Sequence, residues 1–204
     1  MQTLMNLNGS LLNHRRSAVS TLSHDLRQRV ARIEMLLLDV DGVMTDGGLY
    51  YADGGGECQR FHVRDGMGLK LWRQAGKRAG IITGRTSRAA AARVAELRLE
   101  VVVQGADRKL PAFQAALRQH GLGPEQVAYA GDDLPDVPVL AECGLAVAVA
   151  DACPEVVASA HYVTKAAGGH GAVREIIELI LRAQGLWRQV VDRVVDPVVE
   201  SIGA

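Results

Sequence analysis

Short, largely apolar runs alternate along the chain with longer segments whose apolar residues recur every three or four positions. The runs are residues 35–38, 79–83, 101–103, 127–130, 145–150 and 161–164. Apolar runs of this length, bounded by glycine or polar turns, are typical of strands buried on both faces of a sheet. The segments between them predict helices, for example over residues 87–97 and over 109–120, which Gly121 ends. Strands and helices in alternation predict an α/β fold with a doubly wound, Rossmann-like parallel sheet.

The two ends of the chain follow different patterns. Residues 1–20 are polar and lack periodicity, which predicts a flexible N-terminal tail. Residues 21–185 carry all the strands and form one domain. Residues 186–204 keep apolar side chains at helical spacing and are expected to form a C-terminal helical tail. Pro197 should break or kink that helix, because proline lacks a backbone N–H.

Residues 49–63 depart from this alternation. Two strand-like runs flank Asp53 and three consecutive glycines, a pattern that predicts a β-hairpin. Tyr50, Tyr51 and Phe61 give the hairpin apolar surface, and an isolated two-stranded hairpin is only marginally stable in water. The hairpin is therefore expected to pack against neighbouring copies of the chain, or alternatively to fold down on its own domain.

Composition narrows the functional classes. The formal net charge is zero and aromatic residues make up only 4% of the chain, so neither a nucleic-acid nor a membrane partner is expected. No apolar run approaches the roughly 18 residues of a membrane span, and the N-terminus has no apolar core typical of a signal peptide. The scattered Cys58, Cys143 and Cys153 favour reduced thiols in a cytoplasm.

Polar residues follow three of the predicted strands, at the edge where ligands of open α/β sheets bind. They are Asp39 and Asp41, then Thr83, Gly84 and Arg85, then Asp132 and Asp133. Two carboxylates leaving a central strand can hold a hard cation or perform acid–base and nucleophilic work. An EF-hand loop is excluded because the twelfth position from Asp39 is Tyr50 instead of glutamate.

Structural roles are the alternatives for each residue taken singly. The first pair of carboxylates could form a solvated acidic turn, and Thr83 could cap the following helix. Lys109 could be a solvated helix residue. The acids of the segment GDDLPD could be a cluster favoured by a helix dipole. Asp136 in that segment is expected to orient Lys109 rather than to bind a ligand directly.

Together, the segments DVDG, TGR and GDDLPD, with Lys109 opening a helix before the third, resemble the haloacid dehalogenase superfamily of phosphohydrolases. The resemblance implies that Asp39 is the nucleophile that forms an aspartyl-phosphate. It implies that Asp41 is the general acid and then the base, that Thr83 holds a phosphate oxygen, and that Lys109 offsets negative charge. It also implies a Mg²⁺ cofactor bound by Asp39, the carbonyl of Asp41 and Asp132, with Asp133 in or beside the coordination sphere.

A narrower resemblance covers roughly residues 30–185. The runs FHVRDGMGLK, IITGR, VAYAGDDLPD and GGHGAVRE are similar to those of phosphatases that act on 3-deoxy-D-manno-octulosonate 8-phosphate, a lipopolysaccharide precursor. The resemblance implies that substrate contacts in this chain come from Gly84, Arg85, His62, Arg64 and Asp65. Arg85 is the best candidate for binding the sugar-acid carboxylate. His62 could instead be a structural histidine.

The alternatives within this fold are a phosphatase of nine-carbon sialic-type acid 9-phosphates, a phosphatase of polynucleotide ends, and a non-catalytic oligomerisation or regulatory domain. Neutral charge and few aromatic residues count against the polynucleotide. The intact set of acids and lysine counts against the non-catalytic domain.

The spacing of the motifs leaves no room for a cap domain. The first gap holds a hairpin and one helix, and the second holds only a helix and a strand. Because an aspartyl-phosphate site must exclude water, a partner subunit is the expected lid. The chain is therefore predicted to form a homo-oligomer, with a tetramer as the expected form, in whose assembly the hairpin takes part.

Overall fold

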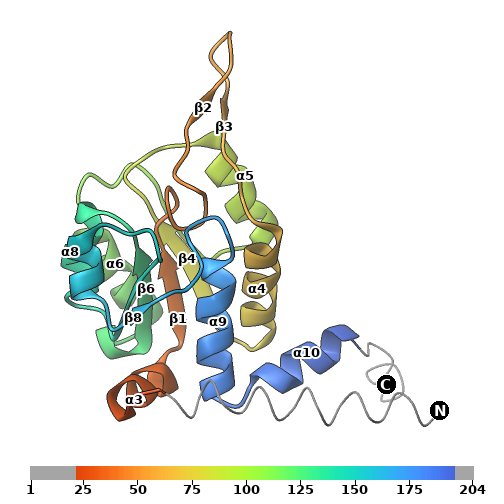
Figure 1. Ribbon diagram of the computed structural model, residues 1–204, viewed down its shortest axis with the longest axis vertical. Coiled ribbons are helices and arrows are strands. Elements are labelled where there is room, and N and C mark those ends of the chain that lie inside the picture. The colour runs from red at the N-terminus through yellow and green to blue at the C-terminus, as the bar shows by residue number, and fades with distance from the viewer. Residues whose placement is uncertain (1–21, 196–204) are drawn as a thin grey trace.

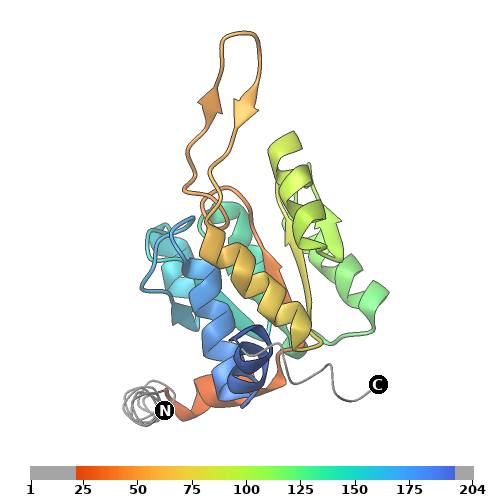
Figure 2. The same ribbon diagram turned by 90° about the vertical axis from the view of Figure 1, so that its right-hand side faces the viewer.

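The structure is a computed structural model that describes residues 22–195 (Figures 1 and 2). The predicted N-terminal tail lies outside the described residues, and so does Pro197. No described helix is both long and apolar enough to cross a membrane.

Six parallel strands form the central sheet, in the order β5-β4-β1-β6-β7-β8. Their bounds are β1 Met35–Leu38, β4 Arg78–Ile82, β5 Val101–Val103, β6 Val127–Gly131, β7 Leu145–Ala148 and β8 Tyr162–Val163. The chain runs outward from β1 through β4 to β5, then returns past β1 to β6 and continues to β8. The predicted doubly wound sheet is confirmed, and its order reverses beside β1, where such sheets bind ligands.

Two layers of helices enclose the sheet, as Figures 1 and 2 show. One layer holds α3 His24–Arg32, α4 Val63–Gln74, α5 Arg88–Leu97, α9 Ala172–Ala183 and α10 Trp187–Val195. The other holds α6 Lys109–His120, α7 Val137–Leu140 and α8 Pro154–Ser159. Strand β1 separates two cores, because Leu36 and Leu38 face the first layer while Met35 and Leu37 face the second.

Local signals set the ends of several helices. Ser87 caps α5 by accepting the backbone N–H of Ala90 at 3.3 Å. Gly121 ends α6 in the left-handed conformation, as the sequence predicted. Short 3₁₀ turns, η1 Pro124–Gln126 and η2 Leu134–Asp136, flank β6. Ser87 and η2 thus mark where the polar segments after β4 and β6 end.

The hairpin of β2 Tyr50–Tyr51 and β3 Glu57–Cys58 stands away from the body, beyond the carboxyl edge of the sheet (Figures 1 and 2). Tyr50 and Tyr51 are 51% and 69% exposed. Phe61, at the base, instead packs against the core beneath α4 and α5. Between β1 and β4 the chain therefore has only this flap and one helix.

Helix α10 packs back onto the domain. Trp187 and Val190 are buried, and Arg174 and Arg182 of α9 lie over the Trp187 ring at 4.8 and 4.6 Å from its centroid. Glu178 pairs with both arginines at 2.8 Å. The described part of the predicted C-terminal helical tail is thus held against α9 by burial and by cation–π contacts.

Candidate active site

Asp39 follows β1 directly at the centre of the sheet. Its backbone N–H donates to the carbonyl of Ala130 at 3.0 Å, which extends the ladder between β1 and β6 by one residue. The chain then turns at Gly42, whose φ of 91° is the left-handed conformation that glycine adopts without strain. The Thr45 hydroxyl braces this turn by donating to the carbonyl of Val40 at 3.3 Å. Only 6% of Asp39 is exposed.

A buried lysine, Lys109, lies between the carboxylates of Asp39 and Asp136. Lys109 Nζ is 2.8 Å from Asp39 Oδ1 and 2.7 Å from Asp136 Oδ1. Burial by itself would lower the pKa of Lys109, but the charges of Asp39 and Asp136 outweigh burial and raise that pKa, so Lys109 is a cation. Lys109 is therefore not a solvated helix residue.

Asp136 is wholly buried and receives four donors. The Tyr129 hydroxyl donates to its Oδ1 at 2.6 Å, and the backbone N–H groups of Asp132 and Asp133 donate to its Oδ2 at 3.0 and 3.3 Å. The fourth donor is Lys109, at 2.7 Å. Asp136 thus holds both Lys109 and the backbone after β6, the position that the sequence interpretation gave it.

The acidic groups of this site fit a divalent cation. Carboxylate oxygens of Asp39, Asp132 and Asp136 lie within 4.8 Å of one another. Burial, reinforced by the charge of Asp39, raises the pKa of Asp132 to about 8, and burial raises that of Asp39 to about 6 against the effect of Lys109. Asp132 Oδ1 is buried with no hydrogen-bond partner. A side chain at Gly42 would collide with that carboxylate. Uncompensated oxygens of this kind are ligands for Mg²⁺.

The other two expected ligands differ in their contacts. Asp41 turns its Oδ1 to the side-chain amide of Gln59, which donates to it at 2.6 Å. Asp133 is exposed, and its carboxylate caps η2 by accepting the N–H of Leu134 at 2.8 Å. The geometry therefore ranks Asp132 above Asp133 as a direct ligand.

The segment after β4 supplies a hydroxyl and a guanidinium. Thr83 is buried, and its hydroxyl accepts the N–H of Arg85 at 3.3 Å, while Ser87 caps the following helix. Arg85 Nη2 lies 2.8 Å from Glu57 Oε2, and its Nε lies 3.9 Å from Asp41 Oδ2. Thr83 is therefore free of the capping role that was its structural alternative.

All three polar segments meet around one cavity of about 380 Å³. It is lined by Asp39, Asp41, Thr83, Gly84, Arg85, Ala106, Asp107, Lys109, Asp132, Asp133 and Pro135. Eight of these lining residues are among the expected site residues, and they come from four separate segments to the carboxyl edge of the sheet.

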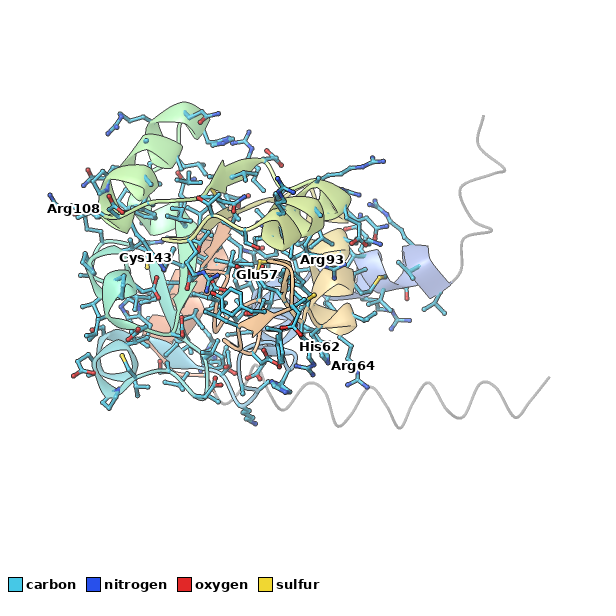
Figure 3. The ribbon with its side chains drawn as sticks, turned by 90° about the horizontal axis from the view of Figure 1, so that it is seen from above. Glu57, His62, Arg64, Arg93, Arg108 and Cys143 are labelled. Atoms are coloured by element: carbon cyan, nitrogen blue, oxygen red, sulfur yellow. The ribbon has the colours of Figure 1, made fainter. Side chains whose placement is uncertain are left out.

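Three expected substrate contacts lie elsewhere. Asp65, in the first turn of α4, accepts the backbone N–H of Arg174 at 2.8 Å and so ties α4 to α9. His62 Nδ1 lies 3.9 Å from Asp65 Oδ2. Arg64 is exposed at the periphery of the view in Figure 3. None of the three lines the cavity within this chain, and their contact with substrate stays a prediction.

Sequence reasoning missed several neighbours of the site. Asp107 and Pro135 line the cavity, and their closeness to Lys109 and Asp132 in the sequence could have indicated them. Glu57 and Gln59 reach Arg85 and Asp41 from the hairpin. No motif marks these two residues, because their role depends on where the hairpin stands.

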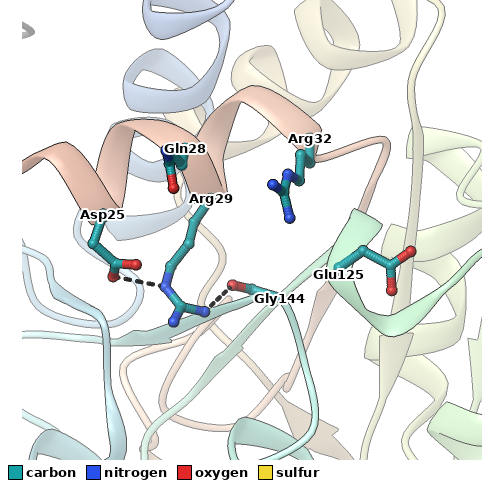
Figure 4. Close-up of a pocket in the computed structure, with 6 residues that line it drawn as sticks. All are labelled: Asp25, Gln28, Arg29, Arg32, Glu125 and Gly144. Carbon is teal, nitrogen blue, oxygen red and sulfur yellow. Dashed lines mark hydrogen bonds and ion pairs between the residues drawn. The ribbon is translucent and has the colours of Figure 1, made fainter.

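A smaller cavity of about 140 Å³ lies at the opposite edge of the sheet, under α3 (Figure 4). Its Arg29 donates to Asp25 at 2.8 Å and to the carbonyl of Gly144 at 3.0 Å. These contacts join α3 to the loop before β7, which is a structural role.

A Rossmann-like parallel sheet that presents a buried aspartate–lysine pair beside further carboxylates is the architecture of an aspartate-dependent phosphohydrolase. A family profile described as haloacid dehalogenase-like hydrolase matches residues 82–176. The chain is 45% identical to the 3-deoxy-D-manno-octulosonate 8-phosphate phosphatase KdsC of Escherichia coli (strain B / BL21-DE3), over 80% of this chain and 87% of the relative.

Solved structures give the same result. The phosphatase of that name from Yersinia pestis superposes with a TM-score of 0.80 at 46% identity, over 82% of this chain and 90% of that one. The one from Moraxella catarrhalis, in complex with magnesium ion, phosphate ion and KDO, gives 0.82 at 36% identity, over 85% and 99%. The chain belongs to the haloacid dehalogenase-like hydrolases and, within them, to the 3-deoxy-D-manno-octulosonate 8-phosphate phosphatase family.

Proposed function

We propose that this enzyme is a Mg²⁺-dependent phosphatase that hydrolyses 3-deoxy-D-manno-octulosonate 8-phosphate to the free sugar acid and phosphate, a step in lipopolysaccharide precursor synthesis. The observation that carries the proposal is the Asp39–Lys109 pair at the floor of a cavity that Asp41, Thr83 and Asp132 also line. The relatives that match along most of the chain support the choice of substrate.

The chemistry follows from the charges around Asp39. A carboxylate oxygen of Asp39 attacks phosphorus, the bond from phosphorus to the sugar oxygen breaks, and Asp41 gives that oxygen its proton. Water then attacks the aspartyl-phosphate while Asp41 accepts its proton, which releases phosphate and restores Asp39. Lys109 offsets the charge that gathers during both steps, and Thr83 donates its hydroxyl to a phosphate oxygen.

Mg²⁺ would be held by the carboxylates of Asp39 and Asp132, with the carbonyl of Asp41. When bound, it neutralises phosphate oxygens and so weakens the repulsion between an anionic nucleophile and an anionic substrate.

Asp132→Asn tests this ligand assignment. We expect it to raise the Mg²⁺ concentration for half-maximal activity by at least about tenfold, since it removes a charged ligand. Asp133→Asn is the matched control, because the Asp133 carboxylate accepts the N–H of Leu134. Magnesium titrations of both variants provide the measurement, and equal shifts would contradict the ranking of the two acids.

Arg85 is the proposed contact for the sugar-acid carboxylate. Its guanidinium already binds a carboxylate, that of Glu57, at the rim of the cavity. Arg85→Ala is expected to lower kcat/KM for the sugar-acid phosphate roughly 30- to 160-fold. This corresponds to a loss of about 2–3 kcal/mol of transition-state stabilisation. A neutral sugar phosphate should lose much less, because it offers no carboxylate. Equal losses on the two substrates would assign Arg85 to phosphate or to structure.

The proposal extends to a cytoplasmic homo-oligomer, with a tetramer as the expected form. Free Cys58, Cys143 and Cys153 fit a reducing compartment, and the exposed Tyr50 and Tyr51 fit an assembly surface on the hairpin. Light scattering should give a mass above that of one chain, and Tyr50→Lys with Tyr51→Lys should lower it, because buried lysines oppose packing. Val102→Lys, at another exposed apolar position, is the control. A fully active wild-type monomer would exclude the assembly.

Phosphate release from a substrate panel tests the function itself. The panel contains 3-deoxy-D-manno-octulosonate 8-phosphate, a sialic-acid 9-phosphate, a neutral hexose phosphate and simple aryl and alkyl phosphates, each with and without Mg²⁺. The expected result is the highest kcat/KM for the first compound, and only with Mg²⁺. A higher kcat/KM for the sialic-acid phosphate would change the assigned substrate but leave the proposed chemistry unchanged.

A further inference from the structure

The second strand of the hairpin, β3, and the residue that follows it reach the site of their own chain. Glu57 and Gln59 are two residues apart, so in an extended segment their side chains project to the same side. Glu57 binds Arg85 at 2.8 Å, and Gln59 donates to Asp41 at 2.6 Å. Figure 3 shows Glu57 over the middle of the molecule, viewed down the hairpin. The flap thus contacts two residues that line the cavity, without lining it itself.

A chain of hydrogen bonds fixes the orientation of the Gln59 amide. The Ala90 N–H donates to Ser87 Oγ, so the hydroxyl hydrogen of Ser87 is available to Gln59 Oε1, which lies 2.7 Å away. With its oxygen engaged, the amide must present its N–H to Asp41 Oδ1. The backbone of Ser87 is fixed in turn, because its N–H donates to Gln104 Oε1 at 2.7 Å.

This bond determines how the Asp41 carboxylate lies. Oδ1 faces the Gln59 amide, and Oδ2 lies on the side of Arg85, 3.9 Å from its Nε. The same bond holds the side chain in one orientation, which general acid catalysis requires.

We propose that Gln59 is a positioning residue: anchored by Ser87, its amide orients Asp41 for proton transfer to the leaving oxygen of the substrate. The inference rests on the proposed phosphatase chemistry but not on the identity of the sugar acid. It gives the flap a role in its own subunit, in addition to any role in assembly.

Gln59→Leu removes the donor at similar size. We expect kcat for an alkyl phosphate to fall by about tenfold to a hundredfold, part of what a general acid supplies, with KM nearly unchanged. For p-nitrophenyl phosphate, whose leaving group needs little protonation, the loss should stay below about threefold. Gln59→Glu keeps the acceptor for Ser87 but turns an oxygen toward Asp41, so its loss on the alkyl phosphate should be at least as large.

Gln114→Leu and Gln114→Glu are matched controls on α6, where the Gln114 side chain donates to Glu142 outside the cavity, and both should behave as wild type. A crystal structure of Gln59→Leu should show the Asp41 side chain displaced or in two orientations. Equal losses on both leaving groups, with Asp41 unmoved, would overturn the proposal. If wild type hydrolyses no phosphate ester, the proposed function fails, and the position of Asp41 in the variant still decides whether Gln59 positions it.

Discussion

Asp39→Asn is expected to lower turnover by at least about a thousandfold, the scale of losing a covalent catalyst. Asparagine keeps the shape of the side chain but lacks the charged oxygen that attacks phosphorus, and it removes one carboxylate from the cation site. It also breaks the ion pair with Lys109, which then keeps only Asp136. Steady-state phosphate release at saturating Mg²⁺ is the measurement.

Thermal unfolding without Mg²⁺ serves as the control for folding. Burial raises the pKa of Asp39 to about 6, so above that pH its charge disfavours the folded state relative to the unfolded chain. At pH 8 the variant should therefore unfold at no lower temperature than wild type. A folded variant that retained a tenth of wild-type turnover would contradict the aspartyl-phosphate mechanism.

Asp41→Asn is expected to produce the second-largest effect, a loss of about a hundredfold to ten-thousandfold on sugar phosphates. The backbone carbonyl that would bind Mg²⁺ remains, so the magnesium concentration for half-maximal activity should change little. Asparagine cannot protonate the leaving oxygen or accept the proton of the attacking water. Kinetics on a series of phosphate esters with leaving groups of increasing pKa provide the measurement.

The dependence on leaving group distinguishes this role from a structural one. p-Nitrophenyl phosphate should lose less than a sugar phosphate, because its departure needs less protonation. Equal losses would show that Asp41 is not the general acid. Asp107→Asn, another acid at the cavity but without a predicted proton-transfer role, is the comparison variant and should show no such dependence.

Much of the site could be predicted from the sequence because each part carries a local signal. A run of four apolar residues makes β1 a buried central strand, and the acids that follow it must then leave at the carboxyl edge. The same argument applies to Thr83 and Asp132. Lys109 has a weaker signal, since only the structure shows that it is buried between Asp39 and Asp136.

Other relations depend on contacts between segments that no local pattern encodes. His62, Arg64 and Asp65 stay predicted substrate contacts, and the structure adds that Asp65 joins α4 to α9. The motif that contains these residues indicates a link to the substrate. It does not indicate which of their side chains will contact a neighbouring helix. Phe61 was expected to give the hairpin apolar surface, and it packs on the domain core instead.

The fold class and the residues at the strand ends were therefore predictable from the chain alone, because strand burial and glycine turns are properties of short segments. Contacts made over long separations, such as Gln59 with Asp41 and Glu57 with Arg85, follow from how the segments pack in three dimensions. Those contacts depend on the angle at which the hairpin leaves the body. That angle is set by packing at its base, where Thr45 pairs with Phe61.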